Sequence, residues 1–167
     1  MMKIYIKNIG IAVLLLSSAS SANAVDGYKN LKFGMTEAQV KASNICNFES
    51  GEKDSNGITT LTCFDFLYGN SNRIASAFIY KNKLYRFTIN IPIESAFPVI
   101  NQLSKKYGGL SSRSTHSGEW KKLDDTPNFT AEAWFDNNTI CESVTNDQNL
   151  EKMVLLTYTA RSFAEIK

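Results

Sequence analysis

The sequence contains few residues of the kinds that build catalytic and metal sites: one histidine and three cysteines in 167 residues. The histidine, His116, lies near Ser112, Ser114 and Ser117, a composition typical of a flexible loop. No two cysteines have the C-x-x-C spacing of many zinc sites. Because a nucleophile needs a neighbouring base and a metal needs several ligands, we predict no catalytic residues, no metal and no cofactor, and a protein that is not an enzyme.

An excess of charge of one sign is also absent. The chain has 18 basic and 16 acidic residues, and two of the basic ones, Lys3 and Lys7, lie in the first 24 residues, so residues 25–167 are formally neutral. Neutrality gives no electrostatic reason to bind nucleic acid or an anionic membrane. Only three prolines occur, and no segment is proline-rich or of low complexity. We therefore expect no linker, and one domain over residues 25–167.

Long hydrophobic runs are missing too, apart from Ile9 to Leu16. A membrane-spanning helix needs about 20 apolar residues, so this run is too short. Lysines precede it, and small residues ending in Ala22-Asn23-Ala24 follow it, the pattern of a secretory signal peptide over residues 1–24. We expect cleavage after Ala24, no lipid-anchored cysteine and no membrane anchor, and a periplasmic or secreted protein.

The three cysteines, Cys46, Cys63 and Cys141, favour one disulfide in an exported protein, with one thiol left over. We prefer the pair Cys46 and Cys63, which closes the shortest loop; such a bridge adds about 3 kcal/mol in the chain-entropy model. Cys141 falls in a short predicted strand, where an unpaired thiol usually packs as a small hydrophobic group.

Two helices are predicted. The first begins at Thr36, whose hydroxyl and backbone amide can form a capping box with Gln39, and ends near Ser43. The second covers residues 96–107, with Ser95 as N-cap and Gly108 after its last turn. In it Phe97, Ile100, Leu103 and Tyr107 form one apolar stripe.

Alternating or β-rich segments predict seven strands, and residues 44–57 are interpreted as a loop. The predicted strands cover residues 58–66, 73–80, 84–91, 119–122, 129–135, 139–144 and 153–160, and the tail after them is expected to form a helical turn. Short connections between strands favour antiparallel pairing. The fold class is therefore α+β: a two-layer structure with an antiparallel sheet of about seven strands and two helices on one face.

The segments Phe33-Gly34-Met35-Thr36, Gln39-Val40, Cys46 and Leu61-Thr62-Cys63-Phe64-Asp65 resemble one repeat of the β-lactamase inhibitor protein family. In that family such a repeat has a helix opened by Gly-Met-Thr and two cysteines bridged between helix and strand. The helix-opening motif is also similar to that of BamE-type outer-membrane lipoproteins. The second predicted helix lacks both features, and the mature start lacks a cysteine, so the resemblance implies a shared scaffold and transfers no binding residue.

Trp120 and Trp134 are the candidate binding residues, because aromatic side chains dominate interface energetics. Trp134 lies on the strand face opposite Phe135, so it is either an exposed contact or part of a second packed layer. The adjacent Asp124 and Asp125 are interpreted as a solvated turn. We expect a protein-binding module of the cell envelope, an inhibitor or accessory factor whose partner is another envelope protein. The alternative is a domain that binds a small ligand or the cell wall.

Overall fold

The structure, a computed structural model, describes residues 25–164 of the chain. The predicted signal peptide lies outside the described residues. Within them, no helix is long and apolar enough to cross a membrane.

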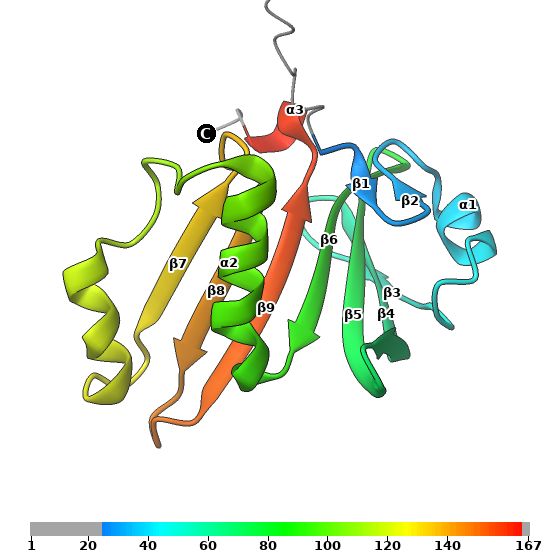
Figure 1. The fold of residues 1–167 in the computed structure, drawn as a ribbon. Helices are drawn as coiled ribbons and strands as arrows, with labels where there is room; N and C mark the ends of the chain where they lie inside the picture. The colour runs from blue at the N-terminus through cyan, green and yellow to red at the C-terminus, as the bar shows by residue number, and fades with distance from the viewer. Residues whose placement is uncertain (1–24, 165–167) are drawn as a thin grey trace, which may run out of the picture.

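A seven-stranded sheet forms one layer, and all of its strand pairs are antiparallel (Figure 1). The strand order is β3-β4-β5-β6-β9-β8-β7. This confirms the predicted α+β class. The strands are β3 (Glu49–Lys53), β4 (Ile58–Tyr68), β5 (Ser71–Tyr80), β6 (Lys83–Ile91), β7 (Thr130–Phe135), β8 (Ile140–Asn146) and β9 (Lys152–Thr159), and a separate hairpin pairs β1 (Gly27–Tyr28) with β2 (Leu31–Lys32).

The helices that cover the sheet are α1 (Glu37–Ala42) and α2 (Ala96–Tyr107). At the start of α1, the predicted capping box is confirmed: the Gln39 amide donates to the Thr36 hydroxyl at 3.3 Å, and the Thr36 amide donates to the Gln39 side chain at 2.9 Å. At the end of α2, Gly108 has a φ of 88°, the positive value that favours glycine. The short α3 (Arg161–Ala164) confirms the helical turn expected in the tail.

Two predicted segments were wrong. Residues 44–57 contain β3, a fully exposed edge strand whose polar sequence gives no apolar signal; it forms by pairing with β4, Glu49 opposite Thr62. Residues 119–122 form no strand but belong to a 3₁₀ helix, η2 (Ser117–Asp124). The three-residue spacing of Trp120 and Leu123 places both on one side of η2, which suits this tighter helix.

The core lies between the sheet and its covering elements. Along β6, β9 and β8 every second side chain faces this layer, with Phe87 beside Tyr158 and Tyr158 beside Ile140. Helix α2 covers β7 and β8, whereas α1 and the β1–β2 hairpin cover the other half of the sheet (Figure 1). A second short 3₁₀ helix, η1 (Ile93–Ser95), leads into α2.

The predicted start and stripe of α2 need correction. Ser95 makes no side-chain cap, because it is already the last residue of η1 and has a helical backbone. The buried side chains of α2 are Ala96, Val99 and Leu103, so the buried face is rotated from the predicted one. Phe97 is 72% exposed as a result.

Candidate functional site

An apolar groove runs between α2 and η2. It consists of two cavities of about 390 and 310 Å³, both lined by Phe97, Ile100 and Trp120. Val144 of β8 contributes to the first cavity and Ala133 of β7 to the second. The remaining lining residues are Ile93, Ala96, Lys121, Leu123, Asp124 and Lys152 in the first, and Leu110, Thr115 and Ser117 in the second. The groove therefore has an aromatic and aliphatic lining with few charged groups at its border.

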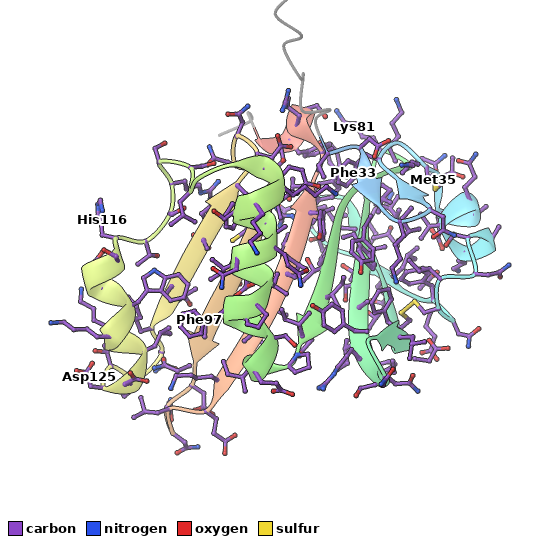
Figure 2. The ribbon with its side chains drawn as sticks, viewed as in Figure 1. Phe33, Met35, Lys81, Phe97, His116 and Asp125 are labelled. Atoms are coloured by element: carbon purple, nitrogen blue, oxygen red, sulfur yellow. A yellow bond between two sulfur atoms is a disulfide. The ribbon has the colours of Figure 1, made fainter. Side chains whose placement is uncertain are left out.

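Several apolar side chains of the groove face solvent. Phe97 projects from α2 toward η2 (Figure 2), and Ile93 and Leu110 are 48% and 54% exposed. Exposed apolar side chains that gather around a depression are typical of a binding site, whereas isolated ones are common on any protein. The groove thus can remove apolar surface of a ligand from water.

Trp120 occupies the centre of the groove, because it lines both cavities. Its side chain is half-buried, and its indole Nε1 donates to the Thr115 carbonyl oxygen at 3.3 Å. The ring is thereby held by η2 and the preceding loop. His116 precedes η2 and Asp125 follows it (Figure 2), and neither side chain lines the groove.

Trp134, the other predicted binding residue, lies on the opposite face of the sheet and is only 9% exposed. Its Nε1 donates to a Glu132 carboxylate oxygen at 2.8 Å, and the Arg113 guanidinium lies 4.1 Å from a ring centroid. The loop that carries Arg113 runs along the edge of β7: the Ser111 amide donates to the Trp134 carbonyl, and the Thr115 amide donates to the Glu132 carbonyl. Trp134 therefore packs under this loop, away from the groove.

Cys141 is the free cysteine, and it is buried beside Trp134 on the neighbouring strand. Burial raises the pKa of its thiol, chiefly because the thiolate would lose its hydration, and the nearby Glu132 carboxylate raises it further. The thiol is therefore protonated at neutral pH, which agrees with its predicted role as a small packed side chain.

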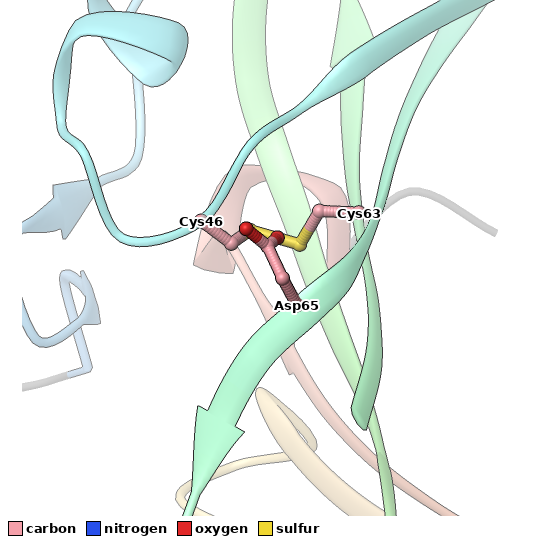
Figure 3. A group of neighbouring side chains, drawn as sticks. All are labelled: Cys46, Cys63 and Asp65. Carbon is pink, nitrogen blue, oxygen red and sulfur yellow. A yellow bond between two sulfur atoms is a disulfide. The ribbon is translucent and has the colours of Figure 1, made fainter. Parts of the chain in front are cut away.

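The predicted disulfide is confirmed: Cys46, in the segment between α1 and β3, is bonded to Cys63 on β4, with the Cα atoms 6.2 Å apart (Figure 3). Asp65 lies beside the two sulfur atoms, as a metal ligand would. Its carboxylate accepts hydrogen bonds from the backbone and side-chain amides of Asn47. Since the two sulfurs are bonded to each other, they offer no thiolate, and the cluster fixes the segment after α1 to the sheet.

Sequence reasoning missed Glu142 on β8. This side chain is completely buried on the helix-covered face, between Ala133 and Leu156 on the neighbouring strands. Neither carboxylate oxygen has a hydrogen-bond partner among residues 25–164. Loss of hydration raises the pKa of Glu142 to about 8. The signal was present in the sequence, because Glu142 alternates with the apolar Ile140 and Val144.

Fold and groove together define a two-layer α+β protein with an apolar groove beside α2. Residues 28–166 match a family described as "Uncharacterised protein", and the chain belongs to that family. It is also 32% identical over 156 residues to an "Uncharacterized protein" of Haemophilus influenzae, covering 92% of this chain and 87% of that relative. No solved structure matches the chain significantly.

Proposed function

We propose that this chain is a non-enzymatic, exported binding protein that holds an apolar segment of another cell-envelope protein in the groove between α2 and η2. The observation that carries the proposal is that two aromatic side chains, the exposed Phe97 and the half-buried Trp120, each line both cavities. Aromatic side chains that line one groove can bury an apolar side chain of a partner that enters it. Export is supported by the signal-peptide pattern of residues 1–24 and by a disulfide, a bond typical of oxidising compartments.

Polar groups at the border of the groove suit a protein segment as the ligand. The Lys152 ammonium and the Asp124 carboxylate pair at 3.0 Å there, and both residues line the first cavity. A polar rim around an apolar centre is the usual anatomy of a protein interface. The backbone of a bound segment can hydrogen-bond to such a rim while its apolar side chains enter the cavities.

The test compares Phe97 with Phe64, which lies on β4 outside the groove and is 63% exposed. A photo-crosslinking amino acid at position 97, in protein recovered from the periplasm with Val25 at its N-terminus, should give a discrete adduct with one envelope protein. The same amino acid at position 64 should not. With that partner purified, Phe97→Ser should weaken binding at least about tenfold and Phe64→Ser should leave it unchanged. Equal loss in both variants, or an adduct only from position 64, would contradict the proposal.

A further inference from the structure

Asp136, the first residue of the turn between β7 and β8, carries a carboxylate that is largely removed from water, since its side chain is only 10% exposed. Its cationic partner among residues 25–164 is Arg161 of α3, whose guanidinium nitrogen lies 3.5 Å from Oδ1. A buried charge is costly unless it is closely paired and hydrogen-bonded. Because the Arg161 side chain is exposed and this distance is long, the pair compensates only part of the burial of the carboxylate.

The other carboxylate oxygen, Oδ2, accepts hydrogen bonds from two donors. The Thr139 hydroxyl, which belongs to the same turn, donates at 2.8 Å, and the backbone nitrogen of Val25 donates at 3.0 Å. Val25 and Asp136 are 111 residues apart in the sequence. The segment before β1, the β7–β8 turn and α3 therefore meet at one end of the sheet, and the Asp136 carboxylate connects all three (Figure 1).

Val25 is held beside Asp136 by the β1–β2 hairpin that follows it. The Phe33 amide donates to the Asp26 carbonyl at 2.8 Å, next to the antiparallel pairing of β1 with β2. The Val25 side chain is half-buried and packs against the core. The place of the Val25 nitrogen is therefore set by contacts of residues 25–33.

Val25 is also the residue after the expected signal-peptide cleavage site. In the intact chain its nitrogen belongs to the peptide bond with Ala24 and offers one uncharged N–H group. Hydrolysis of this bond by a signal peptidase adds the oxygen of water to the Ala24 carbonyl carbon, and the nitrogen leaves as an amine. The amine takes up a proton at neutral pH, because the ordinary pKa of an α-amino group is about 7.7–8.0. Cleavage thus converts a neutral donor to Oδ2 into a cation with three N–H groups.

We propose that removal of residues 1–24 creates an ion pair between the Val25 α-ammonium and the Asp136 carboxylate, and that this ion pair makes the mature protein more stable than its precursor. The ammonium supplies the charge that the exposed Arg161 provides only in part. The stability of the fold is thereby coupled to processing, since the chain gains this ion pair only after the signal peptide has been removed. The inference rests on the export included in the proposed function and does not involve the groove between α2 and η2.

Urea unfolding at pH 6.5 compares two disulfide-bonded forms released from a fusion partner, one beginning at Val25 and one at Ala22. In the longer form the Val25 nitrogen stays an amide, so the hydrogen bond to Asp136 remains without the charge. A hydrogen bond to a charged donor is the stronger one, so the unfolding equilibrium constant of the shorter form should be at least about fivefold smaller. Asp136→Asn should abolish this difference, whereas Asp26→Asn, which removes an exposed carboxylate paired with Lys32, should retain it.

The pH dependence of this difference needs no variant. Pairing with the carboxylate raises the pKa of the Val25 ammonium above its unfolded-state value of about 7.7–8.0. The stability from the ion pair is therefore fully present below that value and is lost as pH rises through the folded-state pKa. The difference between the two forms should stay constant from about pH 6 to 7 and shrink toward about pH 10. The Arg161 guanidinium, the Asp26–Lys32 pair and the buried Glu142 are common to both forms, so their titration cancels.

Equal stability of the two forms would overturn the proposal, and so would a difference that persists in Asp136→Asn or does not change with pH. A first residue other than Val25 in protein purified from the periplasm, found by intact-mass measurement, would overturn it as well. The absence of a crosslink from position 97 would contradict only the proposed role of the groove.

Discussion

Glu142 makes the stability of this protein depend on pH. Its folded-state pKa of about 8 lies above the ordinary glutamate value near 4.5, because the charged form loses its hydration on burial. The folded state therefore binds a proton that the unfolded state releases over this range. Stability contributed by the protonated group is fully present below pH 4.5 and is lost as pH rises toward 8.

Glu142→Gln should therefore stabilise the protein most at alkaline pH. Between the two pKa values the wild type loses about 1.4 kcal/mol per pH unit at this site, and glutamine does not titrate. Urea unfolding of both proteins at pH 5, 7 and 9 measures the difference, which should grow with pH. Glu151→Gln serves as the control, with a nearly constant difference from the wild type. A Glu142→Gln protein whose stability follows the wild-type pH dependence would show that Glu142 is not the titrating group.

Single residues also show where sequence patterns stopped being informative. The helical spacing of Phe97 with Ile100 and Leu103 predicted that Phe97 is buried. In the structure α2 is rotated so that Ala96 and Val99 face the sheet beside Leu103. Because Ala96 and Val99 are smaller than Phe97, their helical spacing is a weaker sequence signal of a buried face. Trp134 was placed correctly on the face opposite Phe135, yet the loop that covers it depends on hydrogen bonds between segments 20 residues apart. The groove at Trp120 could not be predicted for the same reason, because it forms between segments that are distant in the sequence.

At the scale of elements, α1 is the clearest case in which local sequence determines structure. It is six residues long and buries only Val40. A helix this short has little stability of its own, so its reciprocal cap and its packing must hold it.

Thr36→Ala removes the hydroxyl that accepts from the Gln39 amide. We expect a loss of about 1 kcal/mol in the free energy of unfolding, since the amide is left to solvent. Ser104→Ala, on the exposed side of α2, is the control and should change stability by less than about 0.5 kcal/mol. Chemical denaturation measures both. The cap contributes nothing if the two variants have the same stability.

Elements whose sequence has an apolar pattern were predicted well, whereas elements that form by pairing with or packing on a neighbouring element were not. Strands β4, β5, β6, β8 and β9 alternate or are rich in β-branched residues, and their positions followed from the sequence within a few residues. Strand β3, Glu-Ser-Gly-Glu-Lys, has no such pattern and exists because β4 offers it an edge. In η2, the charged residues between Trp120 and Leu123 resembled a short polar strand.

At the scale of the whole molecule, the disulfide connects the segment after α1 to the sheet across a separation of 17 residues. Replacing both partners, Cys46→Ala with Cys63→Ala, should lower the free energy of unfolding by about 2–5 kcal/mol, because the unfolded chain gains freedom. For a protein of ordinary stability this loss is large.

Guanidinium denaturation with and without dithiothreitol measures this effect. The double variant should not respond to the reductant, and Cys141→Ala should respond as the wild type does. Mass spectrometry of unreduced peptides should recover Cys46 joined to Cys63. A peptide in which Cys141 is joined to Cys46 or to Cys63 would contradict the pairing. It would also contradict the resemblance to the β-lactamase inhibitor protein family, and that resemblance stays a prediction.

The two edge strands of the sheet, β7 and β3, differ in whether their outer backbone groups are already hydrogen-bonded. At β7, the loop from Ser111 to Thr115 occupies the backbone groups of Glu132 and Trp134, so no further strand can be added there. At β3 no segment of residues 25–164 covers the outer edge in this way, and the exposed glutamates and lysine of the strand discourage pairing. Continuous head-to-tail stacking of sheets needs two compatible edges on every copy. A molecule with one blocked edge can form at most a closed pair through β3, so strand addition cannot propagate into a fibre even at high protein concentration.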